Sequence, residues 1–308
     1  MESHPNMNGQ DARSEILCVG EMLWDLHVPA GTPLIAANHV SFEPGGSATN
    51  VARHLVKQGI RAGVVGVVGE DALGAALVER IAREGVDVHN VVKMRARTGL
   101  VLISNDPAVA IAYRAADEEG QAFRQAIKGD YKCRIMHFSN LLPDRTAIHA
   151  LTRAAQRART AGSVVVVDAN LRPRLWRADA VAKTNPFELL KTADVLKLSV
   201  DDMQLLGIDD PEVFREELED HAILILTRGT QPTQAWSSRG SVSVPVVKLD
   251  IPIAVGAGDA FSAGCLSTML DMPQRMWGAR NELEGIVAHG NAVARAYLEQ
   301  RLSPRSTT

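Results

Sequence analysis

The sequence lacks an excess of charge of one sign and lacks long apolar runs. Its 308 residues carry a formal net charge of −3, so charge gives no reason to expect binding to nucleic acid or to a membrane surface. A membrane-spanning helix needs roughly 20 consecutive apolar residues, and no run approaches that length. We therefore expect neither a nucleic-acid partner nor a membrane partner. We expect one domain at residues 15–302, with disordered tails at 1–14 and 303–308.

Cysteine is also scarce, and the polar first residues contain no signal-peptide core. Cys18, Cys133 and Cys265 are far apart and show no metal-ligand spacing. We interpret them as small core residues of a protein in the reducing cytoplasm. His137 and His289 have no partner pattern for acid–base catalysis, so we interpret both as satisfied structural histidines.

The sequence does contain a series of short apolar runs separated by helical patterns. Such runs are expected of parallel strands that are covered on both faces. They lie at residues 16–20, 62–69, 135–139, 163–168, 195–199 and 222–227, and helices are expected at 71–84 and 144–161. Strands that alternate with helices predict an α/β fold with a doubly wound, mostly parallel sheet and helices on both faces.

Polar residues follow several of these runs. Gly20 and Glu21, residues 168–170, Ser199 and residues 227–229 all come at the carboxyl ends of expected strands. In open α/β sheets, ligands bind outside these strand ends. We therefore expect the functional site along this edge of the sheet.

The most informative segment reads GAGDAF and spans residues 256–261. Its small residues let backbone N–H groups converge on an anion, and the helical pattern that follows places the turn at a helix N-terminus. A carboxylate beside such an anion cradle is suited to taking a proton from a hydroxyl during phosphoryl transfer. Taken alone, however, this string is more typical of a turn with a capping Asp.

A second glycine-led turn, GGSATNVA at residues 45–52, also enters an expected helix. Together the two segments resemble the paired signatures of the PfkB, or ribokinase-like, carbohydrate kinases, and the resemblance runs from about Ile16 to Leu302. It implies a ribokinase-like fold with a small β-sheet lid formed by about residues 22–44 and 91–115. It also implies ATP as co-substrate, Mg²⁺ as cofactor and a possible homodimer through the lid.

The resemblance implies roles for residues in both turns. The implied catalytic residues are Asp259 as general base and, stabilising the transferred phosphoryl group through their backbone, Gly256, Ala257 and Gly258. The implied sugar contacts are Gly45, Gly46, Asn50 and, in a Gly-Glu-x-Leu-x-Asp pattern, Asp25. Without the match, Asp25 would be read as a surface residue and Asn50 as a packing residue.

Residues 168–176 read DANLRPRLW and resemble a segment of the fructokinase and 2-keto-3-deoxygluconate kinase branch. In this segment Asn170 and Arg172 are the implied sugar contacts, and Arg172 could reach an anionic group. Arg114 follows Tyr113 as in a lid pair of the keto-deoxy-sugar kinases, although an exposed strand-edge charge explains it equally well. Fructose is therefore the first expected substrate, 2-keto-3-deoxygluconate the second and a riboside the third.

The sequence signals for nucleotide binding are less specific than those for the two glycine-led turns. By resemblance, nucleotide contacts are expected at Ser199, Thr227, Arg228, Gly229 and Asn291. A core-facing helix is an equal alternative for Asn291. Asp202 stands where the family has a Glu that organises Mg²⁺, and we expect its contact with the metal to run through water.

The chain departs from the family pattern beside the nucleotide. Relatives usually carry Asp-Thr-x before the catalytic turn, where this chain has Ile253, Ala254 and Val255. Apolar side chains cannot supply oxygen ligands, so activation by a monovalent cation is not expected. Pro232 also replaces a common glycine. These departures leave open a non-catalytic sugar or nucleotide sensor, whereas the lack of Gly-x-Gly-x-x-Gly after the first strand argues against a dinucleotide-binding oxidoreductase.

Overall fold

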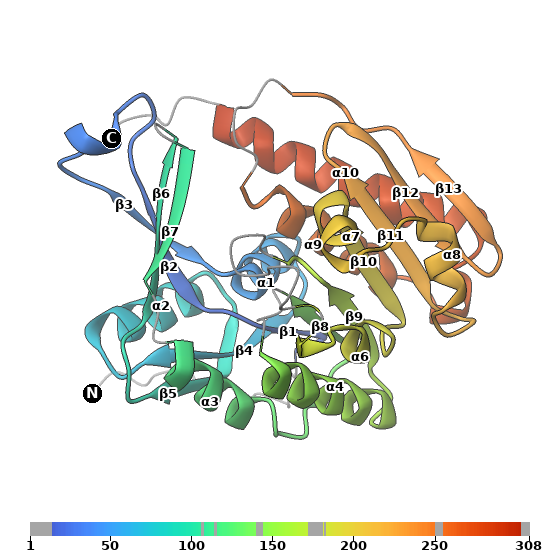
Figure 1. Ribbon diagram of the computed structural model, residues 1–308, viewed down its shortest axis with the longest axis horizontal. Helices are drawn as coiled ribbons and strands as arrows, with labels where there is room; N and C mark the ends of the chain where they lie inside the picture. Colours follow the sequence, from blue (N-terminus) through green and yellow to red (C-terminus); the bar gives the residue numbers. More distant parts are fainter. Residues whose placement is uncertain are drawn as a thin grey trace, which may run out of the picture.

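A computed structural model describes residues 14–105, 108–113, 116–139, 144–171, 181, 183–249 and 255–302. Within these residues the chain forms a nine-stranded sheet, helices on both of its faces, and a separate four-stranded sheet (Figure 1). The expected α/β class, with a large mostly parallel sheet and a small second one, is confirmed. No helix in the described ranges is long and apolar enough to cross a bilayer.

The large sheet has the order β13-β12-β11-β10-β9-β8-β1-β4-β5. Its parallel strands are β1 (Ile16–Val19), β4 (Ala62–Gly69), β5 (Asp87–Met94), β8 (Ile135–Ser139), β9 (Val164–Asp168), β10 (Val195–Ser199) and β11 (Ile223–Arg228). The antiparallel strands β12 (Gln231–Ser237) and β13 (Gly240–Val244) extend one edge. All six predicted apolar runs form strands, within one residue at each end, because burial on both faces selects uninterrupted apolar sequence.

Two hydrophobic cores lie on the two faces of this sheet. One face is covered by α1 (Ser47–Lys57), α2 (Ala72–Arg83), α9 (Ala257–Leu270) and α10 (Arg280–Leu302). The other face is covered by α3 (Ala116–Ala126), α4 (Arg145–Thr160), α6 (Phe187–Leu190), α7 (Val200–Leu206) and α8 (Pro211–Glu216). The helices expected at 71–84 and 144–161 are α2 and α4, and each begins where an Asp side chain caps its first turn.

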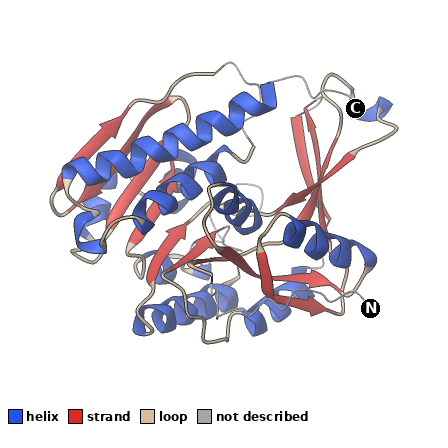
Figure 2. Ribbon diagram, turned by 180° about the vertical axis from the view of Figure 1, so that it is seen from behind, coloured by secondary structure: helices blue, strands red, loops and turns tan. Residues whose placement is uncertain are grey.

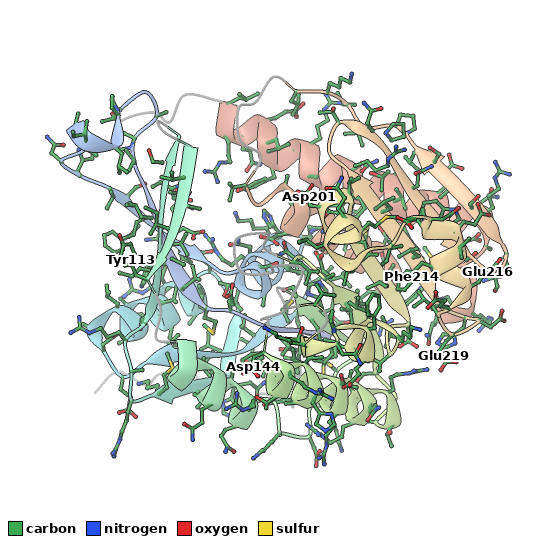
Figure 3. All side chains as sticks on the ribbon, viewed as in Figure 1. Tyr113, Asp144, Asp201, Phe214, Glu216 and Glu219 are labelled. Atoms are coloured by element: carbon green, nitrogen blue, oxygen red, sulfur yellow. The ribbon has the colours of Figure 1, made fainter. Side chains whose placement is uncertain are left out.

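The small sheet stands apart from the large one (Figure 2). Its strands, in the order β3-β2-β6-β7, are β3 (Ser41–Gly45), β2 (Leu23–His27), β6 (Gly99–Asn105) and β7 (Ala108–Tyr113). Figure 3 shows Tyr113 on this sheet and Phe214 on α8, at opposite ends of the molecule. The expected second lid segment began too early: residues 91–94 belong to β5, because their backbone pairs with β4 in the large sheet.

The strand order creates a crevice at the middle of the sheet. β1 lies between β4 and β8, so the chain leaves β1 toward one edge and later returns to its other side. Connections diverge at such a switch point and leave a ligand-binding crevice at the carboxyl ends of the strands. The N-terminal turns of α1 and α9 meet near this crevice, where Ser47 is hydrogen-bonded to Asp259.

Candidate active site

Both glycine-led turns begin a helix, as the sequence predicted. Gly46 is the N-cap of α1 with φ 92°, and Gly256 is the N-cap of α9 with φ 87°. These positive φ values disfavour any residue with a β-carbon. A β-carbon at Gly46 would overlap the carbonyl oxygen of Glu21, and one at Gly256 would lie 2.6 Å from Oη of Tyr297. Close backbone packing and left-handed geometry therefore both require glycine at these two caps.

The carboxylate of Asp259 links the two helices. Oδ1 accepts a hydrogen bond from the hydroxyl of Ser47 at 2.5 Å, and Oδ2 accepts one from Nδ2 of Asn50 at 2.9 Å. Asn170, which follows β9, donates from Nδ2 to the same Ser47 hydroxyl at 3.0 Å. Three residues predicted separately, Asp259, Asn50 and Asn170, thus lie in one network.

Ser47 is the member of this network to which sequence analysis gave no role. It lies inside the glycine-led segment that marked the turn, directly after the cap residue Gly46. Hydroxyl residues at the start of helices are common, so its position alone did not indicate a contact with a carboxylate 212 residues away. Only the packing of α1 against α9 shows that contact.

A cavity of about 110 Å³ opens beside this network, between the small sheet, α1 and α10. Asp25, Asn50 and Gly256 contribute to its lining. Asp25 approaches the first glycine of the turn so closely that a β-carbon at Gly45 would lie 2.5 Å from its carboxylate. Two of the predicted sugar contacts, Asp25 of β2 and Asn50 of α1, therefore line one cavity, and Gly45 lies next to Asp25. Arg114 and Arg172 lie outside the described residues.

Tyr297 of α10 supports the backbone just before residues 256–258, the turn at the start of α9. Its hydroxyl donates to the carbonyl oxygen of Val255 at 3.0 Å. Its ring packs edge-on against the ring of His54 on α1, with the two ring centroids 5.0 Å apart. Burial, with the nearby cations Lys57 and Arg53, lowers the pKa of His54 to about 4. The imidazole is therefore neutral at pH 7 and packs as an uncharged ring.

The side chain of Asp202 is buried in the first turn of α7, directly after β10. It forms a reciprocal capping pair with Ser199, and its Oδ1 accepts from the backbone N–H of Leu171 at 2.6 Å. Burial raises the pKa of Asp202 above its usual value, against the opposing effect of Lys197 and of the Ser199 hydrogen bonds. Because both oxygens accept bonds from the chain, the geometry favours a capping role over direct metal ligation. Among the described residues, no cluster of three candidate metal ligands occurs.

The other predicted nucleotide contacts lie at the end of β11 and in the middle of α10. Thr227 donates to the carbonyl oxygen of Leu198 at 3.3 Å, Arg228 is exposed, and Gly229 has φ 61°. The amide of Asn291 accepts from Thr233 and donates to the carbonyl oxygen of Pro245. These bonds give Asn291 a structural role at the end of the sheet, and its contact with a nucleotide stays a prediction.

A buried ion pair lies beneath the catalytic turn. Nζ of Lys197 donates to both oxygens of Asp168, at 2.9 and 3.0 Å, and the Ser262 hydroxyl donates to Asp168 at 3.0 Å. Sequence analysis included Lys197 in the apolar run at residues 195–199 but gave this residue no role. The available signal was a lysine inside an apolar strand, since an isolated lysine is almost never fully buried.

The histidine interpretation needs correction. His137 is fully buried beside this ion pair, and neither ring nitrogen has a hydrogen-bond partner among the described residues, so it is structural but not satisfied. Burial and the Lys197 charge lower its pKa to about 3, which keeps it neutral. His289 lies exposed on α10. Cys18 and Cys265 are buried as expected, whereas Cys133 is half-buried.

A comparison with protein families shows the family of this chain. The family described as pfkB family carbohydrate kinase matches residues 13–306. The chain belongs to this family. A pfkB family carbohydrate kinase is a phosphotransferase that uses an alcohol group as acceptor. In this chain Asp259 lies in the first turn of α9, and its role as base stays a prediction.

Curated relatives of this kinase include plant fructokinases. It is 30% identical to Fructokinase-1 of Zea mays over 290 residues, covering 89% of this chain and 88% of the relative. It is 28% identical to Fructokinase-1 of Oryza sativa subsp. japonica over 301 residues, covering 91% of this chain and 90% of the relative. The similarity thus spans both the small sheet and the large one.

Solved structures show the same fold. A fructokinase with bound ATP from Xylella fastidiosa superposes with a TM-score of 0.73 at 24% identity, covering 91% of this chain and 90% of that one. The aminoimidazole riboside kinase from Salmonella enterica has a TM-score of 0.72 at 22% identity, with 91% and 92% covered. At this identity the likeness establishes the fold alone.

The Ser47–Asp259 bond gives a prediction for the Ser47→Ala variant. We expect kcat for phosphoryl transfer to fall about tenfold, because a base displaced by a fraction of an ångström loses its alignment with the acceptor. The free energy of unfolding should fall by about 1.5–3 kcal/mol, as for other hydrogen bonds to charged groups. Steady-state kinetics and urea unfolding measure the two effects.

Thr49→Val is the matched control, because its hydroxyl, in the same turn, bonds to the carbonyl oxygen of Glu21 instead of Asp259. This variant should lose stability but keep its kcat. Equal loss of kcat in both variants would show that Ser47 does not act through Asp259.

Proposed function

We propose that this kinase transfers the γ-phosphate of ATP to a hydroxyl of a small sugar, with fructose as the first candidate. The observation that carries the proposal is the position of Asp259, at the N-terminus of α9 and beside a cavity lined by Asp25 and Asn50. Relatives named fructokinase and an ATP-bound fructokinase of the same fold support the choice of sugar and nucleotide.

The proposed mechanism uses the two glycine-led turns together. The sugar binds against Asp25 and the start of α1, so that one of its hydroxyls reaches the Asp259 carboxylate. A carboxylate can accept about four hydrogen bonds, so Asp259 can hold Ser47 and Asn50 and also accept the substrate proton. The N-terminus of α9, from Gly256 to Gly258, stabilises the transferring phosphoryl group through its backbone dipoles. Mg²⁺ would be held mainly by the nucleotide phosphates and water, where it would neutralise phosphate charge.

Two other acceptors stay in consideration. A sugar acid, 2-keto-3-deoxygluconate, is favoured by the two arginines Arg114 and Arg172, which could bind its carboxylate. A riboside is the third candidate, and the neighbouring fold of an aminoimidazole riboside kinase is compatible with it. A non-catalytic sensor of the same fold is the alternative from another class.

The Asp259→Asn variant tests the reaction. We measure ADP release from Mg·ATP with fructose, 2-keto-3-deoxygluconate, ribose and several nucleosides, for wild type and variant side by side. Wild type should turn over one sugar, and the variant should lose a factor of about a hundred or more in kcat, because an amide cannot take the proton.

The same variant should still bind Mg·ATP, since Asp259 lies on the acceptor side of the transferred group. Turnover that survives in the variant would remove Asp259 from the role of base. A folded wild type that binds a sugar or ATP but turns over no acceptor would favour the sensor.

We also propose that potassium has little effect on this enzyme. Ile253 and Ala254, which lie outside the described residues, replace the oxygen ligands that relatives use for a monovalent cation. Initial rates should therefore agree closely in buffers that contain Na⁺ or K⁺ at equal ionic strength. Strong activation by K⁺ would contradict the proposal.

A homodimer through the small sheet is a further proposal. Large apolar side chains are exposed on this sheet, including Phe42 (46% exposed), Ile111 (38%) and Tyr113 (58%), and clustered apolar exposure marks interaction surfaces. Analytical ultracentrifugation should give the mass of a dimer for wild type and a monomer for Ile111→Lys. A wild-type monomer at micromolar concentration would exclude this assembly.

A further inference from the structure

Lys197 is a buried cation in the middle of an otherwise apolar strand. Its neighbours Leu196 and Leu198 pack into one core of the large sheet, while Val195 packs into the other. Because side chains alternate along a strand, Lys197 lies on the same face as Val195, which α9 and α10 cover. Only 10% of its side chain is exposed.

The ammonium of Lys197 lies directly behind the catalytic turn. Two of its contacts are the oxygens of Asp168 on the adjacent strand β9. On the side of α9, a β-carbon at Gly258 would lie only 3.5 Å from Nζ. Figure 1 shows β9, β10 and the start of α9 converging at the centre of the molecule. The cation therefore lies between the end of the sheet and the turn that holds phosphate in the proposed reaction.

This position is electrostatically unusual for a cation. The N-terminus of a helix carries partial positive charge, which disfavours a neighbouring ammonium and favours an anion. A buried ion pair is also often no more stabilising than an apolar pair of the same size. Stability of the fold alone therefore explains a lysine at this position poorly. Attraction of a polyanion to the turn explains it directly.

The surrounding groups keep this lysine charged. Burial by itself would lower the pKa of Lys197, but nearby carboxylates outweigh that effect and raise it above its usual value. The facing groups are Asp168 of β9, Asp202 of α7, Asp259 of α9 and the neutral His137 of β8. Lys197 is therefore positively charged at neutral pH.

We propose that Lys197 is a positioning residue whose fixed charge, held by Asp168 behind Gly258, increases the affinity of the turn at the start of α9 for the nucleotide's phosphates. The proposal rests on ATP being the phosphate donor and on no particular sugar. It makes Lys197 act through the turn, with Asp168 setting the place of the ammonium.

The test compares a charged and an uncharged ligand. Binding of Mg·ATP and of adenosine is measured by isothermal titration calorimetry for wild type, Lys197→Gln and Lys197→Arg. The Gln amide can still donate a hydrogen bond to Asp168 but carries no charge. We expect Lys197→Gln to weaken Mg·ATP at least tenfold and to leave adenosine unchanged, and Lys197→Arg to retain most of the ATP affinity.

A merely structural role predicts a different result. If Lys197→Gln weakens ATP and adenosine alike, or neither, the proposal is overturned. Ser262→Ala is the matched control, because it removes one hydrogen bond to Asp168 and leaves the charge in place, so its preference for ATP over adenosine should be that of wild type. A wild type that binds adenosine but not Mg·ATP would instead refute ATP as the donor, which keeps the two failures distinct.

A second variant covers the case in which Lys197→Gln fails to fold, because Lys197→Gln leaves the buried Asp168 carboxylate without its cation. Lys197→Met combined with Asp168→Asn removes both charges at once, and an Asn can still accept from Ser262. Its thermal unfolding is followed by circular dichroism before titration. The same selective loss of Mg·ATP affinity is expected, and wild-type selectivity in this folded double variant would overturn the proposal.

Discussion

The hydrogen-bond network around Asp259 is the constraint on which the rest of the site depends. One carboxylate holds Ser47 and Asn50 from α1, and Ser47 in turn holds Asn170 from the end of β9. The two glycine caps fit closely against other parts of the chain, because a β-carbon at Gly46 would overlap the Glu21 carbonyl and one at Gly256 would meet the Tyr297 hydroxyl. The proposed sugar-binding and phosphate-binding parts of the site therefore meet at the Asp259 carboxylate, the group proposed to accept the proton.

Charge in this site is arranged in layers. In the proposed reaction the backbone dipoles at the start of α9 face the phosphate, and buried charges lie behind them. Lys197 and Asp168 form one buried pair, while Asp202 is held by Ser199 and Leu171. Such an arrangement keeps polar groups fixed before the substrate arrives, so little reorganisation is needed during phosphoryl transfer.

Much of the fold could be predicted from the sequence because its signals are local. Apolar runs such as residues 163–168 mark buried parallel strands, and Asp71 and Asp144 mark the starts of α2 and α4. The lid boundary was less predictable, and residues 91–94 were expected in the lid. What assigned them to β5 was pairing with β4, a contact that local sequence does not encode.

The sequence by itself determined the two glycine-led turns, the strand ends that carry polar residues, and the choice of Asp259. The turns and the strand ends follow from residue type and spacing, which act over a few residues, whereas the choice of Asp259 rests on the resemblance of the paired turns to a known family. Only the tertiary structure decided that Ser47 holds Asp259 and that Lys197 pairs with Asp168 behind Gly258. The physical reason is that the order of the strands brings together residues that are far apart in the sequence. Burial then strengthens the hydrogen bonds and ion pairs that these residues form.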